Sequence, residues 1–194
     1  RHDACHHARR PRSRIPCPTE YIMLTRLAIL AIVLLAAACA KTEEENVQSL
    51  PPSVVRAIDA FAEECAAAGG VANTRDAARR VDLNGDRRAD FVVYAGWIPC
   101  DNALGVFGDR TKVLMVFAGD TGGDAQQAFS DDVYDVTVET RDSRQELWLT
   151  TSGEECGRTQ AAAFADETFC DRQLVWTTAG RFELAPLDAA RLLK

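Results

Sequence analysis

Residues 82–90, with the sequence DLNGDRRAD, carry oxygen side chains at loop positions 1, 3, 5 and 9. These are Asp82, Asn84, Asp86 and Asp90, and the backbone carbonyl of Arg88 at position 7 would add one more oxygen. Calcium takes roughly six to eight oxygen ligands in irregular geometry, whereas magnesium needs a stricter octahedron and zinc prefers His or Cys. We therefore expect the loop to bind calcium. A plain hairpin is the alternative, because the Asn-Gly pair at positions 3 and 4 is a turn signal by itself.

The loop departs from an EF-hand, since Gly85 is at position 4 instead of 6 and Val93 stands where that loop has Glu. It resembles the calcium-binding hairpin loop of FG-GAP and VCBS-type repeats, D-x-N-G-D-G-x-x-D followed by an apolar strand, here Phe91–Tyr94. The resemblance occurs once, so it implies a calcium loop and no propeller. Arg87 replaces the family's usual Gly. A positive φ there would cost roughly 1 kcal/mol, and we expect weak affinity, about 10⁻⁴ to 10⁻³ M.

A longer resemblance, to a group of small exported bacterial lipoproteins of unassigned biochemistry, covers most of the chain after residue 64. It implies an exported one-domain protein and no particular activity. The segments that carry it are Cys65 to Gly70, Val81 to Asp86, Cys156-Gly157, Cys170, Leu174 to Trp176 and Gly180 to Phe182.

Cys39 follows an apolar run from Leu27 to Ala38, and Arg26 precedes that run. A basic residue, an apolar stretch and small residues at its end are typical of a secretory signal. The three alanines before Cys39 resemble a bacterial lipobox, which implies that Cys39 is acylated, for example with palmitate, and becomes the first mature residue. The alternatives are a plain cleaved signal and an uncleaved anchor, although a spanning helix needs about 20 apolar residues.

The domain boundaries follow from this signal. Residues 1–22, before Met23, are interpreted as over-translated upstream sequence, and 23–38 as the lipoprotein signal peptide. Residues 39–50 form an acidic tether, and 51–194 a single globular domain.

Four further cysteines, Cys65, Cys100, Cys156 and Cys170, follow the signal. An even number of cysteines in an exported chain predicts two disulfides. Three pairings are open, and we favour Cys65–Cys100 with Cys156–Cys170, because each joins neighbouring segments.

Histidine is confined to positions 2, 6 and 7, so the mature chain offers no His for a catalytic triad or a metal. The net charge is −7 for the whole chain and becomes −11 without the first 38 residues, which hold six arginines and two acids. Such an acidic domain is not expected to bind nucleic acid, which requires clustered Lys and Arg.

The periodicity predicts an α+β fold: an N-terminal helix packed on a largely antiparallel β-sheet or half-barrel, with a short C-terminal helix. Pro51-Pro52 opens the first helix, and its apolar stripe includes Val54, Ile58, Phe61 and Cys65. Pro186 opens the second helix. The expected strands are 79–83, 90–95, 112–118, 133–139, 145–151, 173–177 and 181–184.

These patterns predict a bacterial envelope protein that faces the periplasm, anchored by lipid on Cys39 to the outer rather than the inner membrane. Its domain would bind an unknown envelope protein or serve a structural role without catalysis, supported by calcium. One alternative is an inhibitor of a basic envelope enzyme such as lysozyme, and another is a periplasmic hydrolase that uses carboxylates. Trp97, Trp148 and Trp176 would suit a platform for sugar or peptidoglycan, although core packing is the favoured interpretation.

Overall fold

The computed structural model describes residues 49–193, which belong to one compact unit, Ser49–Lys194. The expected upstream segment, signal peptide and lipid-bearing Cys39 lie outside the described residues, as does most of the tether. No helix within residues 49–193 is long and apolar enough to cross a membrane.

The expected α+β class is wrong, because the described residues are mostly β. They form eleven strands in three antiparallel sheets, and their single α-helix is α2 (Pro52–Ala67). The three sheets also replace the single sheet or half-barrel that we expected. The strands are β1 (Val71–Ala72), β2 (Ala78–Val81), β3 (Asp90–Tyr94), β4 (Cys100–Asp101), β5 (Lys112–Gly119), β6 (Ala125–Val133), β7 (Asp135–Arg141), β8 (Arg144–Ser152), β9 (Phe169–Trp176), β10 (Phe182–Leu184) and β11 (Arg191–Leu192).

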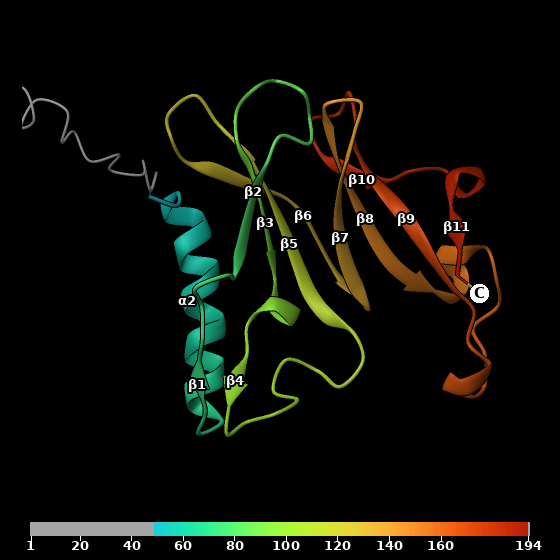
Figure 1. Ribbon diagram of the computed structural model, residues 1–194, viewed down its shortest axis with the longest axis horizontal. Coiled ribbons are helices and arrows are strands. Elements are labelled where there is room, and N and C mark those ends of the chain that lie inside the picture. The colour runs from blue at the N-terminus through green and yellow to red at the C-terminus, as the bar shows by residue number, and fades with distance from the viewer. Residues whose placement is uncertain (1–48, 194) are drawn as a thin grey trace, which may run out of the picture. The chain divides into compact units, whose positions relative to one another are not determined.

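Two larger sheets carry most of the fold (Figure 1). The first has the order β2-β3-β5-β6, and the second has the order β10-β9-β8-β7 with β11 paired to β9. Tyr134 alone separates β6 from β7, and its N–H donates to the carbonyl of Thr150 at 2.9 Å. The chain therefore passes from one sheet to the other at a single residue. The third sheet is the short pair β1-β4.

Strand β3 separates two apolar cores because all five of its residues are buried and their side chains alternate between its faces. Phe91 and Val93 pack on one side with the buried stripe of α2. Val92 and Tyr94 pack on the other side with residues of the second sheet, such as Leu147. The β2-β3-β5-β6 sheet thus lies between the helix and the second sheet.

Helix α2 begins directly after Pro51, as the proline pair predicts, and ends at Ala67. Pro51 cannot cap the first turn with a side chain, and the cap comes from the β5–β6 hairpin instead. Asp124 Oδ1 accepts hydrogen bonds from the N–H and the hydroxyl of Ser53, at 3.2 and 2.8 Å. The hydrogen bond from the N–H of Ala125, together with these two from Ser53, lowers the pKa of the Asp124 carboxyl. This carboxylate satisfies a free N–H at the start of the helix.

The expected C-terminal helix is wrong as well. Pro186 is followed by one 3₁₀ turn, Leu187–Ala189, and then by β11. A helix this short gains little from its own hydrogen bonds. As part of β11, Arg191 instead donates a hydrogen bond to Glu139 Oε1 at 2.7 Å. Its guanidinium also stacks 3.3 Å from the centre of the Trp148 ring.

Both favoured disulfides are confirmed. Cys65–Cys100 joins α2 to β4 across 35 positions, and Cys156–Cys170 joins the 3₁₀ turn after β8 to β9 across 14. Cys65 and Cys170 are completely buried. The first bridge therefore fixes the helix beside the sheets.

Candidate functional site

The predicted metal loop connects β2 to β3 and is closed by its own side chains. The carboxylate of Asp82 accepts the N–H of Gly85 at 2.8 Å and that of Arg87 at 3.0 Å. Asn84 Oδ1 accepts the N–H of Asp86 at 3.0 Å, and Asp86 Oδ1 accepts the N–H of Arg88 at 2.8 Å. Three of the expected ligands are thus brought together, and each also orders the backbone of the turn.

Asp90 differs from the other three expected ligands because it is buried inside the protein. It is fully buried at the start of β3, and burial raises the pKa of its carboxyl. Its Oδ2 accepts the N–H groups of Leu83 and Asn84 at 2.9 and 3.3 Å, and its Oδ1 accepts the N–H of Gly119 at 3.2 Å. Asp90 therefore attaches the loop to the end of β5.

Gly119 is required by this junction. A Cβ added to Gly119 would lie 2.1 Å from the carbonyl oxygen of Ala89, closer than any side chain can approach. Without a side chain, the end of β5 can lie against the loop, and its N–H can reach Asp90.

The two arginines of the loop have different roles. Arg87 has a φ of 66°, so it adopts the left-handed conformation for which the related loops use Gly. The guanidinium of Arg88 is bonded to Asp86 Oδ2, and its Nε donates to the carbonyl of Gly119 at 3.3 Å. Asn84 Nδ2 also donates to Asp86 Oδ2, at 3.2 Å. The Asp86 carboxylate is therefore already paired with a positive charge, the Arg88 guanidinium.

Asp82, Asn84 and Asp86 provide the oxygen ligands that calcium prefers. The Arg88 guanidinium would compete with such an ion for Asp86. A carboxylate oxygen has more than one lone pair, so its bond to an N–H still leaves room for a cation. Within residues 49–193, no three His, Cys, Asp or Glu side chains are grouped closely enough to hold a metal ion. An ion here would depend on the Asn84 amide oxygen and on backbone carbonyls in addition to two carboxylates.

A groove of about 650 Å³ opens beside this loop. Three hairpins that are distant in the sequence form it, and we call it the three-hairpin groove: the β2–β3 loop, the β5–β6 turn and the β9–β10 turn. Its lining residues are Asn84, Asp86, Arg88, Ala118, Gly119, Asp120, Thr121, Gln126, Gln127, Ala128, Trp176, Gly180 and Arg181. Its volume lies within the range of ligand pockets, roughly 300 to 1,000 Å³. Its other polar residues, such as Gln126 and Arg181, had no local sequence signal.

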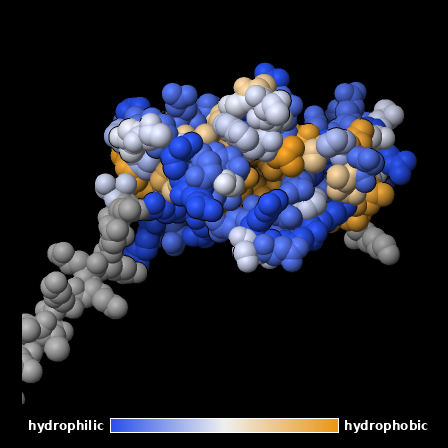
Figure 2. Space-filling model, turned by 90° about the horizontal axis from the view of Figure 1, so that it is seen from above, coloured by the Kyte–Doolittle hydropathy of each residue, from blue (hydrophilic) through white to orange (hydrophobic). Residues whose placement is uncertain are grey.

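The end of the molecule that carries the β2–β3 loop and the β5–β6 hairpin is uppermost in Figure 1, and Figure 2 looks onto it. Near the middle of that view, apolar surface is visible between hydrophilic residues. The groove itself combines Ala118, Ala128 and Trp176 with charged and amide side chains.

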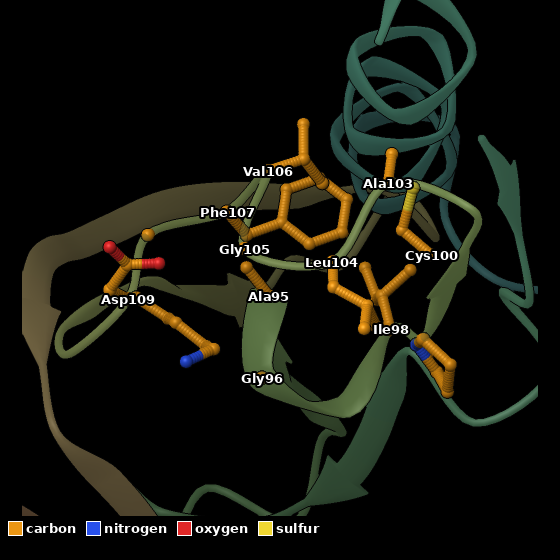
Figure 3. A pocket seen from close by; sticks show the side chains of 13 residues that line it. Ala95, Gly96, Ile98, Cys100, Ala103, Leu104, Gly105, Val106, Phe107 and Asp109 are labelled. Atoms are coloured by element: carbon orange, nitrogen blue, oxygen red, sulfur yellow. The ribbon is translucent and has the colours of Figure 1, made fainter. Parts of the chain in front are cut away.

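A second pocket, of about 370 Å³, lies under residues 103–109 near the Cys65–Cys100 bridge. Figure 3 shows Phe107 and Ile98 among its lining side chains, with Asp109 at one side. The Phe107 ring also packs edge-on against Phe61 of α2, with ring centres 5.5 Å apart. Leu104 is 95% exposed. Asp109 and Lys112 supply its only charged side chains, and it has no amide or hydroxyl side chain, so it offers less binding chemistry than the groove.

The three tryptophans lie in different environments and do not form one platform. Trp148 is buried, with Arg191 over its ring, and its Nε1 donates to Glu146 at 3.0 Å. Trp97 packs against Tyr94 and lies 5.0 Å from the guanidinium of Arg79. Trp176 alone lines the three-hairpin groove.

Comparison of the chain with protein families, with curated proteins and with solved structures found no match.

Proposed function

We propose that this protein is a lipid-anchored component of the bacterial cell envelope, held by acylated Cys39 and facing the periplasm. Its folded domain acts by binding and not by catalysis. The observation that carries the proposal is the pair of disulfides in the domain. Structural disulfides form and persist in oxidising compartments such as the periplasm, and are rare in the cytosol.

The lipid anchor is tested by Cys39→Ser in the full-length chain, expressed in a Gram-negative host that is fed labelled palmitate. The substitution removes the only sulfur at the expected lipobox, so we expect complete loss of label and release of the protein from membranes into the soluble periplasm. Cys17→Ser is the matched control, because Cys17 lies in the upstream segment, and it should keep full labelling. Unchanged labelling of Cys39→Ser would contradict the anchor.

We further propose that calcium binds the β2–β3 loop weakly, because the ion must compete with the Arg88 guanidinium for Asp86. The loop's oxygen ligands support calcium, and the positive φ of Arg87 adds a backbone cost that Gly would avoid. Asp82, Asn84, Asp86 and the carbonyl of Arg88 would hold the ion, while Asp90 would keep the loop in place.

Arg88→Gln should tighten calcium binding roughly two- to fivefold, which is the strength of an exposed ion pair. Arg87→Gln is the matched control: it removes the same charge from a side chain not bonded to Asp86, and should have a smaller effect. Asp82→Ala or Asp86→Ala should abolish binding while the domain stays folded. Titration calorimetry measures the affinity, and thermal melts should show about 1.4 kcal/mol of stabilisation at ten times the Kd. Absence of binding to both the native chain and Arg88→Gln at 10 mM calcium would leave the loop as a plain hairpin.

A further inference from the structure

The three-hairpin groove contains one aromatic ring, that of Trp176, and a buried neighbouring ring holds its orientation. Trp176 is half-buried at the end of β9, and its ring meets Phe182 edge-on, with centres 4.8 Å apart and planes at 67°. Phe182 itself is buried in the core between the sheets. The indole therefore loses little freedom when a ligand stacks on it. An aromatic face offers partial negative charge, which suits the C–H groups on the face of a sugar ring.

Around this ring the groove presents planar polar groups. Gln126 exposes a side-chain amide, able to donate and to accept, on the face of β6 that it shares with its partner Ala118. Arg181 adds a guanidinium from the β9–β10 turn, steadied by a 2.6 Å bond from its Nε to Glu183 Oε1. Amides and guanidinium forks of this kind pair with neighbouring hydroxyl groups.

Two other parts of the groove lining, the turn at Asp120 and the side chain of Arg88, are held in place by hydrogen bonds within the protein. Asp120 Oδ1 accepts the N–H of Gly122 at 2.7 Å and that of Asp124 at 3.0 Å. Arg88 is held by Asp86 and by the Gly119 carbonyl. A preorganised rim reduces the entropy lost on binding.

The charges of the groove are balanced, since its lining holds two carboxylates, Asp86 and Asp120, and two guanidinium groups, Arg88 and Arg181. A groove without net charge selects against phosphate-rich ligands such as nucleic acid, which require excess positive charge. A ligand with many hydroxyl groups and one apolar face fits this combination best.

We propose that the three-hairpin groove binds an oligosaccharide, with Trp176 stacking on a sugar ring and Gln126 and Arg181 bonding its hydroxyl groups. This inference rests on the proposed function, since it supplies the ligand class for a domain that acts by binding. In an envelope, the glycan strands of peptidoglycan are one source of such a ligand.

The test uses residues 39–194 with chitotetraose, cellotetraose and maltotetraose in calorimetry, and with purified sacculi in sedimentation. We expect millimolar or tighter binding of at least one sugar, and sedimentation with sacculi if peptidoglycan is the source. Trp176→Ala should weaken binding about tenfold, which corresponds to the upper end of the free energy that one aromatic contact contributes. Gln126→Ala and Arg181→Ala should each weaken it about fivefold, as expected for one lost hydrogen bond.

Trp176 contributes to the core, so the two exposed substitutions keep the test valid if Trp176→Ala unfolds. Gln160→Ala is the matched control, because Gln160 is exposed outside the groove, and it should leave binding unchanged. No binding of any sugar or of sacculi would overturn the inference, as would binding that Gln126→Ala and Arg181→Ala leave intact. Either result would leave the lipid anchor standing, and loss of the anchor would not affect sugar binding in solution.

Discussion

Asp90→Ala should lower the free energy of unfolding by about 3 to 5 kcal/mol, the largest effect that we expect from one substitution in this domain. Asp90 is fully buried and accepts three backbone N–H groups, from Leu83, Asn84 and Gly119. Alanine would leave these donors without partners beside the core, and each orphaned donor costs roughly 1 to 3 kcal/mol unless water enters. Urea denaturation of residues 39–194 measures the loss.

The matched control is Asp82→Ala, which also removes a carboxylate that accepts two backbone N–H groups of the loop. Gly85 and Arg87 are exposed, so water can replace that carboxylate and the loss should stay near 1 kcal/mol. Both variants are measured with a chelator present, which separates the hydrogen bonds from any effect of calcium. Equal losses in the two variants would contradict the role assigned to Asp90.

Replacing both Cys65 and Cys100 with Ala should destabilise the domain by about 4 kcal/mol, and the same change at Cys156 and Cys170 by about 3 kcal/mol. The difference follows from loop length, since the first bridge spans 35 positions and the second spans 14. A longer closed loop removes more conformational freedom from the unfolded chain. Urea denaturation of the two double variants gives the comparison.

Hydrogen exchange adds a readout that depends on position. Loss of Cys65–Cys100 should speed exchange in α2, because this bridge attaches the helix to β4, whereas loss of Cys156–Cys170 should leave α2 protected. A larger destabilisation from the Cys156 and Cys170 variant would show that loop closure does not determine the ranking.

Local patterns predicted the elements that depend on local physics. The stripe that contains Val54, Ile58 and Phe61 located α2, and Asn84-Gly85 located the β2–β3 hairpin. Strand β6 was missed because most of its residues are exposed and a bulge at its pairing with Val116 and Phe117 breaks the alternation. The C-terminal helix was predicted from Pro186 and the apolar spacing after it, and the pairing of Arg191 with Glu139 favours a strand instead.

The candidate site also contains parts that local sequence patterns predict and parts that they do not. The turn that Asp82, Asn84 and Asp86 order follows from their spacing, whereas the burial of Asp90 depends on Gly119, which lies 29 positions further along the chain. The three-hairpin groove could not be predicted, because Arg88, Gln126 and Trp176 meet only when both sheets have formed. Sequence spacing carries no information about such a meeting.

Apart from β11, which pairs with β9, strand order in both large sheets follows chain order, and this has a consequence for how the protein acquires its fold. A meander of this kind needs no strand to wait for a partner from a distant part of the chain, so most pairing proceeds by short loop closures. The hairpin that carries Cys156 and Cys170 can assemble by itself, while the helix must wait for β3 and β5 before its stripe finds a surface. We therefore expect the sheets to fold first and the helix to dock last, so that Cys65–Cys100 is the second of the two disulfides to form.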